Sequence, residues 1–145
     1  MDRANGAGTV YIWEGKTKKG FLGELFRFVK GVGKALKLDD KELYEVQMAV
    51  GEAAANCQEH SYHGKRGKIQ VKIECDKDEL KVQLTDWGKG LKEDKLPVPH
   101  IVKDLEELDL DGLGVMMMRK SMDEVKFSSQ KGEGKNKVTM VKKLH

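Results

Sequence analysis

The chain is poor in the residues that mark several classes of protein. Its 145 residues include two cysteines, Cys57 and Cys75, and two prolines. The first ten residues, MDRANGAGTV, contain no apolar segment of the kind that directs a chain to secretion. We therefore expect reduced thiols and a cytoplasmic protein. No apolar run approaches the length of a membrane-spanning helix, which argues against a membrane protein.

An excess of charge of one sign is also missing. Lys and Arg number 27 and Asp and Glu number 24, which gives a formal net charge of +3. The lysines are scattered along the chain, so the sequence does not favour direct binding of nucleic acid. Hydrophobic residues make up 39% and charged residues 35%, which suffices for a core under a hydrated surface. The length fits a single domain over residues 1–145.

Apolar residues at helical spacing predict three helices. The first begins at Phe21 and ends near Leu36, and the second runs from about Asp40 to about Tyr62. Asp39 and Glu42 have the spacing of a capping box at the start of the second helix. The third is expected after the segment DGLG, within GLGVMMMRKSM.

Alternating apolar and polar residues predict strands between these helices. We expect a short strand over 10–13, a hairpin over 68–75 and 80–86, and a final strand pair over 124–129 and 137–144. The order of strands and helices predicts an α/β sandwich, with a single mixed, largely antiparallel sheet and helices on one face.

Glu52 and Asn56 stand four residues apart in the second helix, so their side chains are neighbours on one face. A carboxylate can accept a proton, and an amide oxygen is a hard ligand suited to Mg²⁺. The same pair would also be unremarkable as two solvated residues on the outer face of a helix.

The segment DWGKG follows directly after the second strand of the hairpin. Asp86 at the strand end can accept a hydrogen bond from a ligand amine, and Gly88 and Gly90 permit close approach of a ligand to the backbone. An ordinary glycine-rich turn is the alternative interpretation.

Gly112 and Gly114 precede the third predicted helix. Free N–H groups and the helix dipole at such an N-terminus attract phosphate, although a flexible helix start has the same pattern. The long connection before it, residues 91–111, contains both prolines and no strong periodicity. A connection of this length without strong periodicity is usually functional or mobile.

Two further groups of residues allow more than one interpretation. Cys57, His60 and His63 have the spacing of zinc ligands, but no second pair of ligands accompanies them and Cys57 belongs to an apolar stripe. Trp87 and Phe127 fit either the core or a contact with a nucleoside.

The order of these motifs resembles the ATPase domain shared by histidine kinases, type II topoisomerases and mismatch-repair ATPases, known as the GHKL or Bergerat fold. Within that superfamily the chain is similar to the anti-sigma factor serine kinases of the general-stress and sporulation type. MAVGEAAANCQEHSYHG resembles their N-box, LTDWGKGL their first glycine box and GLGVMMMRKSMDEVKF their second.

The resemblance implies ATP and Mg²⁺ as cofactors and a role for each matching position. Asn56 would hold Mg²⁺ and Glu52 would be the general base toward a serine hydroxyl. Asp86, Gly88 and Gly90 would receive the adenine, with Thr139 nearby. Gly112 and Gly114 would shape the phosphate-binding edge of an ATP lid over 91–111. The implied partners are an anti-anti-sigma protein with a STAS domain, a sigma factor and a second copy of the chain.

The sequence departs from the family at one place. No arginine precedes the second glycine box, where some relatives carry one near the γ-phosphate, and Lys92, Lys95, His100 or Lys103 would have to substitute. Two other functions compete with the kinase. One is a non-catalytic module that holds a partner and uses nucleotide only as a structural ligand. The other is a sensor histidine kinase, for which the chain has no room for a dimerisation helix pair before the N-box.

Overall fold

The computed structural model describes residues 8–88, 110–130 and 134–144. Within these residues the chain forms one five-stranded sheet, three α-helices and a π-helical turn, η2. In chain order the elements are β1 (Val10–Lys16), α1 (Phe21–Ala35), α2 (Asp40–Asn56), η2 (Cys57–Ser61), β2 (Lys68–Cys75), β3 (Glu79–Asp86), α3 (Leu110–Ser121), β4 (Glu124–Gln130) and β5 (Lys135–Lys143).

The strands are arranged in the order β1-β2-β3-β5-β4, and all four pairings are antiparallel. The strand β5 is the last in the chain, yet it lies inside the sheet between β3 and β4. Its register sets Asn136 opposite Asp86, so the start of β5 meets the end of β3.

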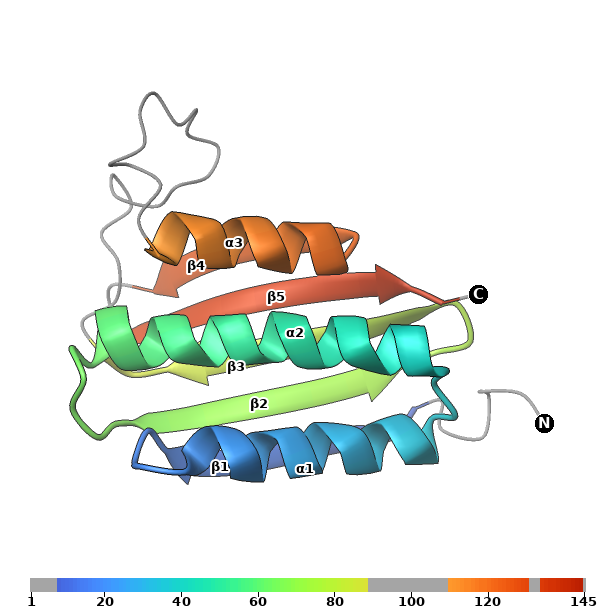
Figure 1. The fold of residues 1–145 in the computed structure, drawn as a ribbon, viewed down its shortest axis with the longest axis horizontal. Helices are drawn as coiled ribbons and strands as arrows, with labels where there is room; N and C mark the ends of the chain where they lie inside the picture. Colours follow the sequence, from blue (N-terminus) through green and yellow to red (C-terminus); the bar gives the residue numbers. More distant parts are fainter. Residues whose placement is uncertain (1–7, 89–109, 131–133, 145) are drawn as a thin grey trace.

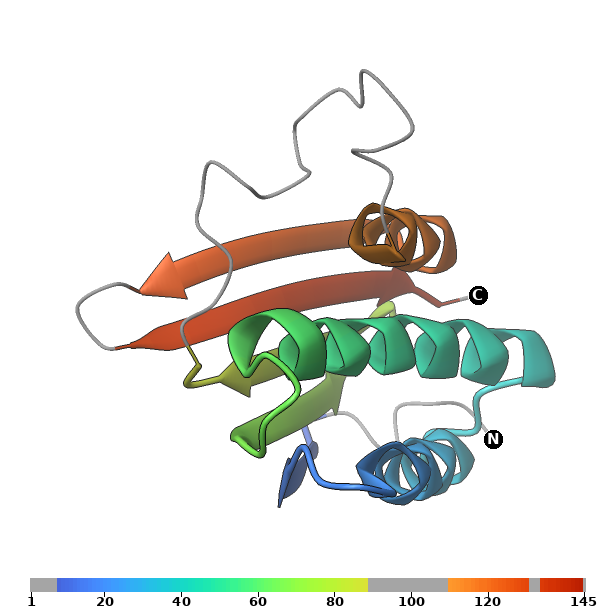
Figure 2. The same ribbon diagram turned by 60° about the vertical axis from the view of Figure 1, so that its left-hand side comes forward.

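The helices α1, α2 and α3 lie side by side on one face of the sheet (Figure 1), and the turned view shows them as a separate layer (Figure 2). The strands alternate accordingly, with Leu80, Val82 and Leu84 of β3 buried beneath the helices. The predicted α/β sandwich with helices on one face of a largely antiparallel sheet is confirmed. Within the described parts of the chain, no helix is both long and apolar enough to cross a membrane.

The helix α2 begins with the predicted capping box. The backbone N–H of Glu42 donates to Oδ1 of Asp39 over 2.7 Å, and the backbone N–H of Asp39 donates to Oε1 of Glu42 over 3.0 Å. The predicted helix over 40–62 is α-helical only as far as Asn56. It then widens into the π-helical turn η2, and Gly64 closes it with a positive φ of 80°.

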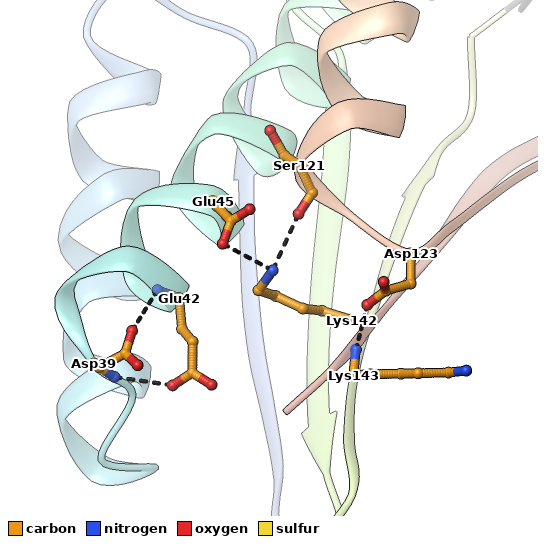
Figure 3. A network of polar contacts seen from close by, with 7 residues as sticks. All are labelled: Asp39, Glu42, Glu45, Ser121, Asp123, Lys142 and Lys143. Atoms are coloured by element: carbon orange, nitrogen blue, oxygen red, sulfur yellow. Dashed lines mark hydrogen bonds and ion pairs between the residues drawn. The ribbon is translucent and has the colours of Figure 1, made fainter. Parts of the chain in front are cut away.

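A buried lysine joins α2, α3 and β5 (Figure 3). Lys142 projects from β5 toward the helices and is 7% exposed. Its Nζ lies 3.1 Å from Oε1 of Glu45 on α2 and donates to the carbonyl oxygen of Ser121, the last residue of α3, over 3.2 Å. A cation at the C-terminal end of a helix also interacts favourably with the helix dipole. Lys142 therefore connects α2 and the C-terminal end of α3 to one strand.

The helix α3 begins earlier than the sequence predicts. It starts at Leu110, so Gly112 and Gly114 lie inside its first turns, and the prediction that both precede the helix is wrong. A glycine in a helix costs about 1 kcal/mol relative to alanine, a penalty that packing against a neighbouring element can offset. Of the consecutive methionines, Met118 is fully buried and Met116 is 52% exposed. Most of the predicted lid over 91–111, residues 91–109, lies outside the described residues.

Candidate functional site

A pocket opens between the C-terminal end of α2, the turn η2 and the strands β3, β4 and β5. Its walls combine a buried carboxylate with amide, hydroxyl and apolar groups, which suits a ligand that is partly apolar and partly polar. The lining residues are Ala53, Asn56, Cys57, His60, Ser61, Leu84, Asp86, Phe127, Ser128, Ser129, Asn136, Lys137 and Val138.

Asp86, the last residue of β3, lies in the wall of this pocket and is 3% exposed. Its Oδ2 accepts hydrogen bonds from Oγ of Ser61 over 2.8 Å and from Sγ of Cys57 over 3.1 Å. Its Oδ1 accepts from Nδ2 of Asn136 over 2.8 Å and from the backbone N–H of Gly88 over 3.0 Å. A buried carboxylate is thus satisfied by four donors from three segments of the chain.

The π-helical turn brings two of these donors to Asp86. Cys57 and Ser61 are the first and last residues of η2, and both are buried. Single π-helical turns within α-helices often occur at functional sites. No pattern in the sequence predicts this turn. Ser61 is therefore a site residue that the sequence analysis does not identify.

Cys57 is a protonated thiol at neutral pH. Burial, together with the negative charge of Asp86 and the hydrogen bond to it, raises the pKa of Cys57 well above 9.0. Burial also raises the pKa of Tyr62, whose hydroxyl donates to the carbonyl oxygen of Lys68 and accepts from the backbone N–H of Trp87. The thiol is therefore a hydrogen-bond donor here rather than a nucleophile.

Asn136 holds the far side of the pocket together. Besides Asp86, its Nδ2 donates to the carbonyl oxygen of Gly88 over 3.1 Å, and its Oδ1 accepts from Oγ of Ser129 on β4 over 2.9 Å. It was not predicted as a site residue, although the alternation of β5 contains the signal. Val138 and Met140 face the helices, so Asn136 does too.

The structure does not bring Thr139 to Asp86. Successive residues of a strand point to opposite faces of the sheet, and Thr139 lies between the buried Val138 and Met140. It pairs with Gln83 and Lys126 rather than with the end of β3. Of these two residues of β5, Asn136 is the one that contacts Asp86.

Gly88 has a specific steric reason to be glycine. A Cβ atom at this position would lie 2.2 Å from the backbone oxygen of Ser61, far inside van der Waals contact. The absence of a side chain therefore allows the turn after β3 to pack against η2. The predicted partner of Gly88 in this motif, Gly90, lies outside the described residues.

Glu52 and Asn56 lie one turn apart on α2 and approach the start of α3. A Cβ atom at Gly114 would lie 2.9 Å from Oε2 of Glu52 and 3.5 Å from Oδ1 of Asn56. The glycine thus lets α3 come close to both side chains. Gly112 also lies within α3. Asn56 lines the pocket that contains Asp86, whereas Glu52 does not.

Asn56 has the character of a ligand-binding residue. Its Nδ2 is buried and has no hydrogen-bond partner among the described residues. A buried amide donor without a partner is costly, and such groups call for an acceptor from a ligand, ion or water. The unpaired Nδ2 therefore suits an acceptor such as a phosphate oxygen, and a hard cation would need Oδ1 of the same amide.

The alternative interpretations of the neighbouring residues are resolved only in part. In the described part of the chain, no three His, Cys, Asp or Glu side chains gather in a way that could hold a metal ion. Phe127 lines the pocket, whereas Trp87 stands beside Lys68, whose Nζ lies 4.8 Å from the centre of the indole ring.

Comparison with known proteins identifies the architecture. The family model described as the histidine kinase-like ATPase domain matches residues 17–142. The chain belongs to this ATPase family. Its curated relatives include an anti-sigma F factor of Clostridium acetobutylicum, 31% identical over 72% of this chain and 72% of the relative. A serine-protein kinase RsbW of Bacillus pumilus is 30% identical over 79% of this chain and 75% of the relative. These matches confirm the predicted resemblance to anti-sigma factor kinases.

Solved structures share the fold of this histidine kinase-like ATPase. The RsbU and RsbW domains of a Mycobacterium tuberculosis protein superpose with a TM-score of 0.62 at 12% identity, over 90% of this chain and 32% of that chain. The SiaB–SiaC complex of Pseudomonas aeruginosa gives a TM-score of 0.61 at 12% identity, over 92% of this chain and 89% of that chain. At such identities the likeness concerns the fold alone.

Proposed function

We propose that the chain is an ATP-dependent protein serine kinase that acts as an anti-sigma factor. It phosphorylates a serine of an anti-anti-sigma partner with a STAS domain, and it binds a sigma factor. The observation that carries the proposal is the pairing of Glu52 with Asn56 on one face of α2, beside the pocket that contains Asp86. The names of the anti-sigma F factor and serine-protein kinase relatives support it.

Each side chain has a defined task in the proposed reaction. Asn56 would hold Mg²⁺, which supplies charge neutralisation for the phosphates. Glu52 accepts the proton of the acceptor serine while the serine oxygen bonds to the γ-phosphorus. The bond from that phosphorus to the β-phosphate oxygen breaks, and ADP leaves with the electron pair. Since a carboxylate is a weak base for an alcohol, positioning must supply most of the rate.

One observation bears on how a nucleotide would bind in either function, the kinase or the non-catalytic binding module. The carboxylate of Asp86 already accepts four hydrogen bonds from the protein. An ionised carboxylate has about four lone-pair sites, so an adenine amino group must displace a donor or share a site. The rotatable donors are Oγ of Ser61 and Sγ of Cys57. In the kinase, one of these two side chains rotates toward the adenine when the nucleotide binds.

Transfer of labelled phosphate decides between the two functions. Wild-type protein, Mg²⁺ and γ-labelled ATP are mixed with a STAS-domain protein of the same organism in single turnover. The kinase predicts phosphoserine on the partner and a loss of about 10²–10⁴-fold in Glu52→Gln, with ATP binding retained. Asn56→Ala should lose both productive ATP binding and transfer. Full transfer by Glu52→Gln would remove Glu52 from the mechanism.

Two further parts of the proposal have separate tests. Mg-ATP at a hundredfold excess over its Kd should stabilise the fold by about 2.7 kcal/mol, and Asp86→Asn should abolish that shift. A homodimer, as expected from the resemblance, should appear as a doubled mass in light scattering. Unchanged melting in millimolar Mg-ATP would count against the nucleotide site, whichever oligomeric state is found.

A further inference from the structure

The two oxygens of the Asp86 carboxylate bind different kinds of donor. Oδ1 accepts from Nδ2 of Asn136 and from the backbone N–H of Gly88. Both of these donors are held in place, because the N–H belongs to the backbone and the amide of Asn136 also donates to the carbonyl oxygen of Gly88. Oδ2 accepts from Oγ of Ser61 and Sγ of Cys57, whose hydrogens rotate about a single bond. Oδ2 is therefore the oxygen at which a ligand can replace a donor of the protein.

Of the two rotatable donors, the hydroxyl of Ser61 is the more useful to a ligand. A hydroxyl is a stronger hydrogen-bond donor than a thiol, so Cys57 gains less by leaving the carboxylate. Ser61 is 7% exposed and lines the pocket. If its O–H turns away from Asp86, it needs another acceptor inside the pocket, because a buried hydroxyl without a partner is costly. A ligand that displaces Ser61 must therefore bring an acceptor as well as a donor.

Adenine carries this combination on one edge. Its N6 amino group is a donor, and the adjacent ring nitrogen N1 is an acceptor. Oγ of Ser61 lies 2.8 Å from Oδ2 of Asp86, so a donor and an acceptor of the protein also lie side by side. The apolar residues Ala53, Leu84 and Val138 line the same pocket and suit the faces of a flat ring. The pocket is thus complementary to the edge and to the faces of this base.

We infer that Ser61 determines specificity for the base by donating a hydrogen bond to N1 while Oδ2 of Asp86 accepts from N6. One rotation of the hydroxyl frees the acceptor and supplies the donor, and Cys57 keeps its bond to the carboxylate. This inference rests on the proposed binding of ATP and adds a recognition residue from η2. A site built in this way rejects an analogue that lacks N1, because the displaced hydroxyl then has no acceptor.

Replacing N1 by a C–H group isolates the proposed hydrogen bond. The ligand 1-deaza-ATP has this replacement and retains the N6 amino group. The analogue 7-deaza-ATP is a matched control, because it loses a nitrogen from the other ring. We measure the Kd of ATP and of both analogues, each with Mg²⁺, by calorimetry on the full chain. The proteins are wild type, Ser61→Ala, Ser61→Thr and Cys57→Ala.

The hydrogen bond predicts that wild type binds 1-deaza-ATP about tenfold more weakly than ATP. In Ser61→Ala this preference should fall to about twofold or less, because the variant has no hydroxyl to leave unpaired. Ser61→Thr, which retains a hydroxyl, and Cys57→Ala should keep the preference. The ratio of the Kd values for 7-deaza-ATP and ATP should be the same in wild type and Ser61→Ala.

Three results would overturn the role of Ser61. The first is an equal affinity of wild type for ATP and 1-deaza-ATP, which needs no variant and so does not depend on the folding of Ser61→Ala. The second is a preference for ATP that persists in Ser61→Ala. The third is a preference that disappears in Cys57→Ala and persists in Ser61→Ala, which would assign N1 to the thiol.

The same measurements distinguish this inference from the proposed kinase function. If wild type transfers phosphate and binds ATP and 1-deaza-ATP equally, the inference is wrong and the kinase stands. If wild type shows the Ser61-dependent preference without transferring phosphate to a STAS-domain protein, the inference stands and the kinase fails. If neither ATP nor its analogues bind to wild type, both fail.

Discussion

Asp86 differs from an open ligand-binding carboxylate in having its hydrogen-bond capacity filled by the protein. Its donors come from η2, from the turn after β3 and from β5, so the side chain has a structural role and a ligand would have to displace or share one of these donors. Low local dielectric strengthens such a network and makes an unpaired member costly. Removing one donor should therefore affect both stability and nucleotide binding.

Asn136→Ala is expected to lower the free energy of unfolding by about 2 kcal/mol, because a buried carboxylate loses a hydrogen-bond donor. The stabilisation by Mg-ATP should fall as well. Thr139→Ala, on the opposite face of the same strand, should change stability by less than about 0.5 kcal/mol and leave the ATP effect unchanged. Chemical denaturation with and without Mg-ATP measures both. If Thr139→Ala instead reduced the stabilisation by Mg-ATP more than Asn136→Ala does, Thr139 would belong to the adenine site.

Cys57 should make stability depend on pH in the alkaline range. Its folded-state pKa is raised above 9.0 by burial and by Asp86, so the folded protein retains the thiol proton where the unfolded chain releases it. The stabilisation is complete below the unfolded pKa and is lost as pH rises toward the folded pKa. We expect the free energy of unfolding to fall as pH rises above about 8.5, the usual pKa of an exposed thiol, and to fall less steeply in Cys57→Ala. Equal slopes in the two proteins would show that Cys57 is not the group responsible.

At the scale of single elements, the close approach of α3 to α2 determines where the side chains of Glu52 and Asn56 lie. Glycine at position 114 lets the first turns of α3 come close to Glu52 and Asn56. The atom that a methyl group would meet there is a carboxylate oxygen at the end of a flexible side chain. Such a contact is relieved when the carboxylate of Glu52 moves. This movement costs the fold little stability, but it shifts the carboxylate away from the position that phosphoryl transfer needs.

Gly114→Ala should accordingly leave stability within about 1 kcal/mol of wild type and reduce phosphoryl transfer by roughly 10²-fold, because a displacement of about 1 Å can cost that much. The control is Gly31→Ala in α1, where a Cβ atom meets nothing within 4 Å. That change should stabilise the protein by about 0.5–1 kcal/mol and leave transfer unchanged. Thermal melts and labelled phosphate transfer measure the two effects.

Element by element, the sequence predicts the regular parts of this fold well. The capping box at Asp39 and the alternation through Leu80, Val82 and Leu84 depend on local patterns, and both hold. The π-helical turn is not predictable in this way, because an α-helix and a π-helix differ by only one residue in the spacing of their backbone hydrogen bonds. Here, tertiary contacts with Asp86 favour the π-helical turn. Thr139 was named from the family resemblance, whereas the alternation of β5 indicates that Asn136 lies on the same face as Asp86.

At the scale of the whole molecule, Lys142 links the helical layer to the sheet. Lys142→Met keeps an apolar chain of similar length but removes the ion pair with Glu45 and the hydrogen bond to Ser121. We expect the free energy of unfolding to fall by about 2 kcal/mol, typical of hydrogen bonds to charged groups. Lys143→Met, on the exposed neighbour, should cost less than about 0.5 kcal/mol. Urea denaturation compares them, and equal losses would contradict a linking role.

The position of β5 inside the sheet has a consequence for biosynthesis. Asp86 and Asn136 are 50 residues apart in sequence yet share a hydrogen bond, and β5 separates β3 from β4. During translation, the ribosome releases β1, β2 and β3 long before the strand that completes their sheet. The nascent chain must therefore carry an open edge on β3 until residues 135–143 emerge, a period in which chaperones protect such edges from aggregation. A chain arrested after residue 134 should remain sensitive to protease on the ribosome, whereas release of β5 should confer resistance.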